Sequence, residues 1–325
     1  MSFILKYRFY LLTILISTLS FGIGFFVHKH QIISNTLKEQ RENSSEFKFT
    51  NPLLECDAGQ DTELRSFEKQ INSSIYSYQQ TKNITEAAVY FRDLNNGLFF
   101  SVGSTEKFSP ASLLKIPLML AYFKEQENNP KIFSQDIIYT KEYDLYGKQA
   151  IKPEIMLEQG KTYNVKDLIG RMVVYSDNSA QQMLMKNAQS FWRTPYKDLG
   201  IDMPEDTQAE NFMSVVDYAR FFRILYNASY LNKQNSNITL GILTQTTFKD
   251  GLVAGIPPNI LVAHKFGERS LGDIKQLHDC GIVYYPSRPY LLCIMTRGTD
   301  FNNLKKVIAK ISKEVYSQVD IQTNK

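Results

Sequence analysis

The sequence predicts an α+β fold, because its strand-like and helix-like segments are separated along the chain. Residues 111–227 have a mostly helical pattern with no strand-like run among them. Five β-rich runs lie on either side of this segment, at 87–94, 98–102, 260–266, 280–285 and 290–296. Strands and helices kept apart in this way indicate α+β rather than alternating α/β. The late strands are joined by short turns, so we expect them to be antiparallel.

A helix is predicted at each end of the folded part. Apolar residues recur at helical spacing near its start, namely Leu64, Phe67, Ile71, Ile75 and Tyr78. A second set with the same spacing lies near the C-terminus and comprises Phe301, Leu304, Ile308, Ile311 and Val315. Such spacing gives each helix one apolar face that packs against a core. Between the first two strands, the sequence Asn95-Asn96-Gly97 indicates a hairpin turn.

The N-terminal segment is predicted to lie outside the fold. Its apolar stretch, residues 9–27, is long enough to span a bilayer. Lys6 and Arg8 precede this stretch, so residues 1–8 are expected in the cytoplasm. We expect an uncleaved single-pass anchor in the cell membrane, with everything after it extracytoplasmic. The alternative is a signal peptide, and the protein would then be secreted after cleavage of residues 1–24.

The remainder of the chain divides into three parts. Residues 28–60 are polar and lack periodicity, which is typical of a flexible linker. Residues 61–319 form the predicted domain, and residues 320–325 form a short tail. The composition, 43% hydrophobic and 22% charged, is that of a globular protein. A formal net charge of +4 is too small to indicate a nucleic-acid partner.

The cysteines do not indicate a disulfide framework. There are three, Cys56, Cys280 and Cys293, and an odd number leaves at least one thiol free. Cys280 and Cys293 fall on two strands of one predicted hairpin. If Tyr285 pairs with Tyr290, the two cysteines are diagonal neighbours roughly 7 Å apart, which is marginal for a bridge. We therefore expect two buried thiols. No metal-ligand spacing is present in the chain, and we expect no metal or other cofactor.

Three short motifs carry chemistry, and they are Ser112-Leu113-Leu114-Lys115, Ser176-Asp177-Asn178 and Lys265-Phe266-Gly267. A serine three residues before a lysine is a weak signal by itself, because it also occurs at 45–48, 66–69 and 104–107. Ser112 differs because it follows a turn-like segment and begins a long apolar run that is typical of a buried helix. The spacing places Ser112 and Lys115 on one face of the first turn.

These motifs, in this order, resemble those of the penicillin-recognising serine enzymes. The chain from about residue 61 to 319 is similar to the class A β-lactamase family and its D,D-peptidase relatives. The resemblance implies a five-stranded antiparallel sheet flanked by the terminal helices, beside an all-helical lobe. It also implies that the three motifs meet in the cleft between the sheet and that lobe.

The residue pattern and the resemblance together assign roles in acyl transfer. A serine hydroxyl needs an adjacent base, and a buried lysine loses its proton more readily than an exposed one. Ser112 is therefore the expected nucleophile and Lys115 its activator. By resemblance, Ser176 passes a proton to the leaving nitrogen. Asn178 orients Lys115 and binds the amide of the substrate, and Asp177 points away and fixes the loop.

The third motif is expected to bind the substrate. By resemblance, Lys265 supplies positive charge for Ser176 and for the carboxylate of the substrate. Gly267 has no side chain, so a substrate backbone could lie against its strand. By the same resemblance, the backbone N–H groups of Ser112 and Glu268 would form the oxyanion hole. His264 and His278 are expected to be structural, because His264 alternates with Lys265 along the strand and therefore faces the other side.

The sequence departs from the family pattern in two places. Phe266 stands where the third motif usually has Thr or Ser, and this change has either a structural effect or an effect on substrate range. No Glu-x-x-Leu-Asn, which carries the water-activating Glu of a class A β-lactamase, occurs in the chain. Glu210 is the candidate nearest to the expected position. Without such a general base, deacylation slows by about 10²- to 10⁴-fold.

The sequence therefore predicts a membrane-tethered extracytoplasmic serine hydrolase that forms an acyl-enzyme on Ser112 with β-lactams and hydrolyses them inefficiently. A D,D-peptidase acting on the stem peptides of peptidoglycan is one alternative. A non-catalytic module that binds penicillin or cell-wall peptides is the other. The expected partners are thus a β-lactam or a peptidoglycan stem peptide, and the membrane through the N-terminal helix.

Overall fold

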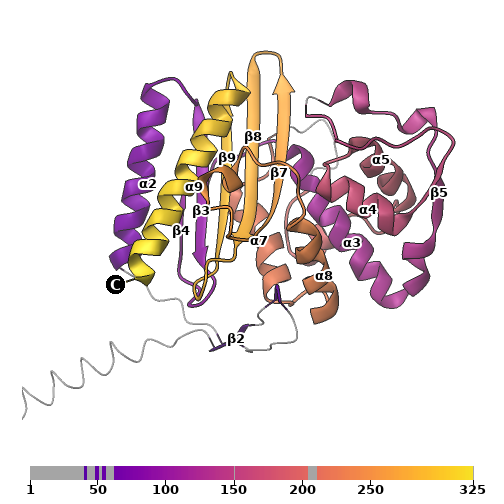
Figure 1. Cartoon of the computed structure of the whole chain (residues 1–325), viewed down its shortest axis with the longest axis horizontal. Coiled ribbons are helices and arrows are strands. Elements are labelled where there is room, and N and C mark those ends of the chain that lie inside the picture. The colour runs from indigo at the N-terminus through magenta and orange to yellow at the C-terminus, as the bar shows by residue number, and fades with distance from the viewer. Residues whose placement is uncertain are drawn as a thin grey trace, which may run out of the picture.

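The computed structural model describes residues 40–41, 48–50, 53–55, 62–149, 151–203 and 211–324. Its centre is an antiparallel sheet (Figure 1). The five strands are β3 (Glu86–Asp93), β4 (Phe99–Val102), β7 (Val262–Leu271), β8 (Ile274–Val283) and β9 (Tyr290–Gly298). Their order in the sheet is β4-β3-β9-β8-β7, so the early pair and the late three are joined through β3 and β9. The predicted α+β class and five-stranded antiparallel sheet are confirmed.

One face of this sheet is covered by the two terminal helices, α2 (Thr62–Gln80) and α9 (Phe301–Thr323). They lie side by side in Figure 1, at the end of the molecule opposite the other helices. The predicted apolar faces are confirmed, because Ile71 and Ile308 have no exposed surface and belong to one core cluster with the sheet. Helix α9 continues to Thr323, past residue 319, where the sequence analysis ended the domain.

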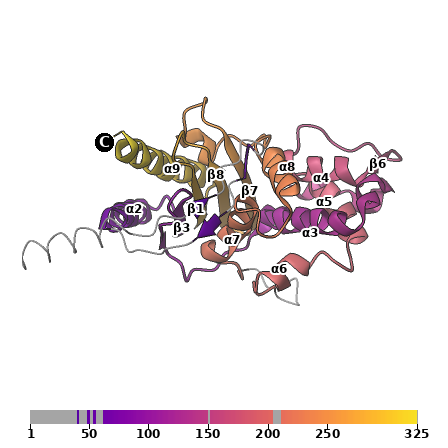
Figure 2. The same ribbon diagram turned by 90° about the horizontal axis from the view of Figure 1, so that it is seen from below.

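The opposite face of the sheet packs against the helical part of the molecule (Figure 2). Its helices are α3 (Lys115–Asn128), α4 (Val165–Val174), α5 (Asn178–Asn187), α6 (Thr194–Asp198), α7 (Val215–Tyr226) and α8 (Lys233–Leu243). Side chains from all six contribute to a second core cluster with the sheet. A small two-stranded sheet, β5 (Asp136–Ile138) with β6 (Thr162–Asn164), also lies in this region, where the sequence predicted helices alone.

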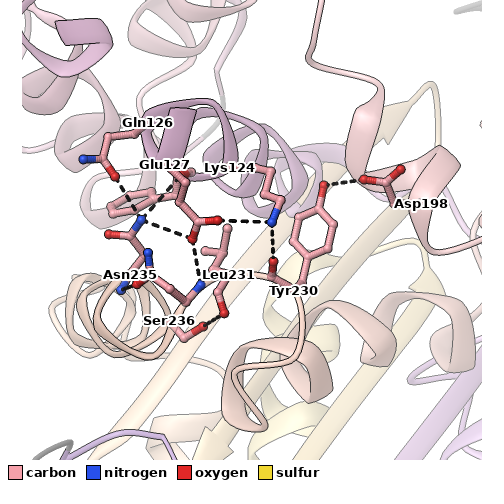
Figure 3. Close-up of polar contacts among 10 residues, drawn as sticks. Lys124, Gln126, Glu127, Asp198, Tyr230, Leu231, Asn235 and Ser236 are labelled. Carbon is pink, nitrogen blue, oxygen red and sulfur yellow. Dashed lines mark hydrogen bonds and ion pairs between the residues drawn. The ribbon is translucent and has the colours of Figure 1, made fainter. Parts of the chain in front are cut away.

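Helix α3, which begins at the lysine of the first motif, is held at its C-terminal end by a polar network (Figure 3). A carboxylate oxygen of Glu127 accepts a hydrogen bond from the backbone N–H of Asn232 at 2.7 Å. The same side chain forms an ion pair with Lys124 at 3.1 Å, and Lys124 donates to the carbonyl of Tyr230 at 2.9 Å. The start of α8 is thereby attached to α3 through charged groups, which form stronger hydrogen bonds than neutral ones.

The pairing of β8 with β9 differs from the prediction by two residues. Val283, not Tyr285, lies opposite Tyr290, and Cys280 therefore lies directly opposite Cys293. Both thiols are free and fully buried, as expected, although the diagonal placement was wrong. A shift of two residues keeps every side chain on the same face of the sheet, so the apolar pattern cannot distinguish the two registers.

Within the described part of the chain, no helix is long and apolar enough to cross a membrane. The predicted anchor at residues 9–27 and the cysteine at position 56 lie outside the described residues. Membrane attachment therefore stays a prediction from the sequence.

Candidate active site

Ser112 lies in a short 3-10 helix, η1 (Ala111–Leu114), that runs directly into α3. The sequence predicted that the buried helix starts at Ser112, and the first turn proves to be the tighter 3-10 form. Ala111 has a φ of 49°, in the left-handed region that non-glycine residues seldom occupy. Strain of this kind costs of order 1–3 kcal/mol and persists only where the surrounding structure imposes it. The turn that presents Ser112 is therefore held by its neighbours.

Strand β8 provides this support through two buried side chains. The side-chain oxygen of Gln276 accepts a hydrogen bond from the backbone N–H of Ser109 at 3.0 Å. Nε2 of His278 contacts the carbonyl of the same serine at 2.9 Å, while its Nδ1 accepts from the N–H of Thr296. Burial lowers the pKa of His278 to about 4, so the ring is neutral at pH 7 and Nε2 carries the proton. The N–H and the carbonyl of Ser109 are thus both hydrogen-bonded, three residues before Ser112, the expected nucleophile.

The side-chain nitrogen of Lys115 lies at the centre of the first two motifs. It contacts Oγ of Ser112 at 2.8 Å and Oδ1 of Asn178 at 2.7 Å. It also contacts the carbonyl oxygen of Ser176 at 2.6 Å and Oγ of Ser176 at 3.0 Å. Burial, reinforced by the positive charge of Lys265, holds the pKa of Lys115 well below its usual value. A neutral amine with one lone pair can therefore accept the hydroxyl proton of Ser112.

Ser176 connects this group to the third motif. Nζ of Lys265, on β7, donates to Oγ of Ser176 at 2.8 Å. Burial lowers the pKa of Lys265 to about 7, although the negative charges of Asp279 and Glu268 oppose that lowering. Ser176 has a φ of 56°, a second left-handed non-glycine residue at the site. Its hydroxyl oxygen thus lies within hydrogen-bond distance of both lysines, where it can relay a proton.

Asp177 has the structural role that was expected. Its Oδ1 accepts hydrogen bonds from the N–H groups of Ser179 and Ala180, at 2.8 and 3.0 Å, and so caps the N-terminus of α5. Its Oδ2 accepts from the hydroxyl of Tyr146 at 2.9 Å. A capping carboxylate satisfies N–H groups that have no partner inside the helix. Asn178, the first residue of α5, is thereby held with its side chain at Lys115.

Gly267 allows β7 to approach η1, which is a different reason from the predicted one. A Cβ atom at this position would lie 2.7 Å from the carbonyl oxygen of Pro110 and 3.0 Å from the backbone nitrogen of Leu113. The space that a side chain at this position would need is thus filled by the backbone of η1, and the predicted contact of the strand with a substrate stays a prediction. The consequence is that Ser112 and Glu268, whose N–H groups are the expected oxyanion donors, line the same pocket.

That pocket has a volume of about 500 Å³. Ser112, Asn178 and Glu268 line it, whereas Lys115 and Lys265 are fully buried behind its wall. The side chain of Glu268 is held by the segment before α4, because its Oε1 accepts a hydrogen bond from the N–H of Ile151 at 2.7 Å. A volume of this size suits a small ligand.

Gln149 is a site residue that the sequence analysis missed. Its Nε2 donates to the carbonyl oxygen of Ser176 at 2.8 Å, and its Oε1 accepts from the N–H of Asn178 at 3.3 Å. The side chain is buried and lines the pocket. These contacts hold the second motif in its left-handed conformation. No local motif marks this glutamine, so the sequence contained no signal for it.

Phe266 contacts the side chain of Lys265, a contact that the sequence analysis did not predict. Its ring stacks on Phe248 with 4.1 Å between centroids, and Nζ of Lys265 lies 4.2 Å from the centre of the Phe266 ring. The aromatic ring thus contributes to the burial of Lys265 where the family usually has a hydroxyl.

His264 is structural as predicted, since its Nδ1 contacts Oδ1 of Asp279 at 2.9 Å and it is almost fully buried. Glu210 lies outside the described residues.

Comparison with known proteins gives the family. The profile of the β-lactamase enzyme family matches residues 66–319, which is most of the chain. The chain belongs to this family. The resemblance inferred from the three motifs is therefore confirmed at the family level, and the protein is a β-lactamase-like hydrolase. No curated protein matches the chain.

Among the described residues, no group of three or more His, Cys, Asp or Glu side chains is placed to hold a metal ion.

Solved structures share the fold at low sequence identity. PBP-A is 21% identical, with a TM-score of 0.66 over 82% of this chain and 98% of its own. A point mutant of PBP-A, 22% identical over 79% of this chain and 97% of its own, was solved as an acyl-enzyme complex with penicillin G, with a TM-score of 0.66. The TLA-1 extended-spectrum β-lactamase is 17% identical, with a TM-score of 0.68 over 78% of this chain and 99% of its own.

Proposed function

We propose that this protein is a serine hydrolase that forms an acyl-enzyme with β-lactams through Oγ of Ser112. The observation that carries the proposal is the 2.8 Å contact between this oxygen and the fully buried amine of Lys115. A β-lactamase-like family and a fold neighbour solved as a penicillin acyl-enzyme support it further.

Acylation follows from the arrangement of these groups. The neutral amine of Lys115 takes the proton of Ser112, and Oγ forms a bond to the lactam carbonyl carbon. The N–H groups of Ser112 and Glu268 would stabilise the negative charge on the carbonyl oxygen. The C–N bond then breaks, and the nitrogen receives a proton from the hydroxyl of Ser176. Ser176 regains a proton from one of the two lysines that contact its oxygen.

Hydrolysis of the acyl-enzyme is proposed to be slow. It requires a base that activates water, and the chain lacks the Glu-x-x-Leu-Asn sequence that supplies one in class A β-lactamases. Glu210 remains the proposed substitute. The same absence favours a second candidate function, a D,D-peptidase that acts on peptidoglycan stem peptides, because acylation by Ser112 does not depend on that base.

Intact mass spectrometry of the full-length protein with a fluorescent penicillin tests both candidates. We expect an adduct on the wild-type protein and none on Ser112→Ala. Ser104→Ala is the matched control that keeps the adduct, because Ser104 also stands three residues before a lysine but is exposed and does not line the pocket. A long-lived adduct would favour the peptidase, and rapid release of hydrolysed penicillin would favour the β-lactamase. Absence of any adduct would contradict both and favour a non-catalytic binding module.

We also propose that residues 9–27 anchor the protein in the cell membrane, with the catalytic domain on the extracytoplasmic side. The proposal rests on the length of the apolar stretch and the preceding Lys6 and Arg8. Alkaline extraction of membranes tests it, because an integral anchor stays in the pellet. Release of a protein whose mass lacks residues 1–24 would instead indicate a cleaved signal peptide.

A further inference from the structure

One side of helix α5 continues the wall of the pocket beyond Ser112. Four residues of this side line the pocket at a spacing of three and four positions, and they are Asn178, Gln181, Gln182 and Met185. Residues at this spacing are neighbours on the surface of a helix. The opposite side of α5 is buried in the core of the helical lobe. The fold therefore fixes which side of the helix a ligand in the pocket meets.

The carboxamides on this side of α5 have hydrogen-bonding groups that the fold does not use. Oδ1 of Asn178 is occupied by Nζ of Lys115 at 2.7 Å, so the NH2 group of Asn178 is left as a donor. The side chains of Gln181 and Gln182 are partly exposed and form no hydrogen bond with any described residue. Each glutamine offers an acceptor oxygen and two donor hydrogens. A row of neutral donors and acceptors thus lines this wall of the pocket.

The charge and the spacing of this row suit a peptide chain. The charged residues that line the pocket, Lys148, Glu268 and Arg269, belong to other segments, so the wall at α5 is uncharged. Four residues of a helix rise about 6 Å along its axis. Two residues of an extended chain span about 6.6 Å, which separates successive amides on one side of it. An extended arm that contacts Asn178 with one amide can therefore place the next one at the two glutamines.

We propose that Gln181 and Gln182 form a subsite for a second amide in the acyl arm of the substrate, so that peptide-like arms react faster than alkyl arms. This inference rests on the proposed acylation of Ser112. The amide nearest the reacting carbonyl contacts Asn178, as the family resemblance implies. The N–H of the next amide donates to a glutamine oxygen, and its carbonyl accepts from a glutamine NH2 group. A peptidoglycan stem peptide carries such consecutive amides, whereas the arm of benzylpenicillin has one.

The test uses two synthetic penicillins whose arms have equal length. One arm is phenylacetylglycyl, which contains a second amide, and the other is phenylpentanoyl, which has methylene groups at those positions. The measured quantity is the ratio of their second-order acylation rate constants on the full-length protein, peptidyl over alkyl. We expect the wild type to prefer the peptidyl arm. In the double variant Gln181→Met, Gln182→Met the ratio should fall about tenfold, chiefly because the peptidyl penicillin reacts more slowly.

Each single variant should lower the ratio in the same direction by a smaller factor. Gln189→Met is the matched control, because it removes a carboxamide from an exposed residue beyond the end of α5 that does not line the pocket. Its ratio should equal that of the wild type.

An unchanged ratio in the double variant, with both penicillins still forming adducts, would overturn the subsite and leave the proposed function intact. An equal loss in both rate constants would mean that the glutamines only support α5, and would overturn the subsite as well. Failure of the wild type to react with either penicillin would overturn the proposed function and this inference together, so the two failures are distinguishable.

Discussion

Lys115 and Lys265 approach the same atom from two lobes, since their Nζ atoms lie 3.0 and 2.8 Å from Oγ of Ser176. Both side chains are fully buried. Two buried ammonium groups this close repel each other, and each favours the neutral form of the other. Lys265 therefore helps to keep Lys115 in the neutral form that can accept a proton, in addition to its expected role toward the substrate.

Removal of the charge at position 265 should move the pH profile of acylation. The fraction of Lys115 that is neutral rises with pH. The acylation rate therefore reaches half of its maximum at the pH that equals the pKa of Lys115. Burial lowers this pKa first and the charge of Lys265 lowers it further, so Lys265→Met should raise it and shift the profile to higher pH. Lys265→Arg stays charged at every pH of the titration and should place the midpoint at or below that of the wild type. Rates of adduct formation across pH measure the shift, and an unmoved midpoint in the Met variant would contradict the coupling.

The close approach of β7 to η1 can be tested with a single methyl group. Gly267→Ala places a Cβ 2.7 Å from the carbonyl of Pro110, so the strand or the turn must move. We expect the free energy of unfolding to fall by about 1–3 kcal/mol and acylation to slow. Gly170→Ala is the control, because an added Cβ in the middle of α4 has no atom within 4 Å apart from the neighbouring backbone of its own helix. That variant should gain about 0.4–1 kcal/mol in urea denaturation.

Stability should depend on pH through His278. Its pKa is about 4 in the folded protein against 6.5 for an unperturbed histidine, so between these values the unfolded chain binds a proton that the folded chain does not. Stability from the neutral ring is complete above pH 6.5 and is lost as pH falls toward 4, by roughly 3 kcal/mol in total. His278→Gln should reduce this slope in chemical denaturation measured at several pH values. An identical slope in the variant would rule out the assignment.

The network at the end of α3 should contribute to stability without affecting the chemistry. Glu127→Ala leaves the N–H of Asn232 and the ammonium of Lys124 without their carboxylate partner. We expect the free energy of unfolding to fall by about 1–2 kcal/mol. Glu125→Ala, two residues earlier on the same helix, should change it by less than about 0.5 kcal/mol. A loss of acylation out of proportion to the loss of stability would indicate a wider role for α3.

The sequence predicted the parts of this molecule that follow from periodic pattern or from rare chemistry. The terminal helices were predictable because their apolar residues recur at 3.6-residue spacing, and Ser112 because a serine and a lysine begin an apolar run. Gln149, Gln276 and His278 were not predictable as site residues. Each acts through a contact with a backbone group distant in the sequence, and such contacts leave no local pattern.

Two further differences have specific physical causes. The β8–β9 register was displaced by two residues, because the connection between Val283 and Tyr290 is longer than the assumed turn and a shift of two preserves the inward face. The packing role of Gly267 was not predicted, because the strand was considered without the 3-10 turn that packs against it. In both cases the deciding contact is tertiary.

The contacts of Lys115 join residues 61 and 63 positions away, and Lys265 reaches Ser176 over 89 positions. Ser112 can be activated in the proposed way only when the sheet and the helical lobe have folded and packed together. In an unfolded chain the lysines are in water and have their usual pKa values, so they are protonated at neutral pH. A covalent penicillin label would therefore count native molecules alone. The rate at which labelling returns after dilution from denaturant would report the last step of folding, the joining of the sheet to the helical lobe.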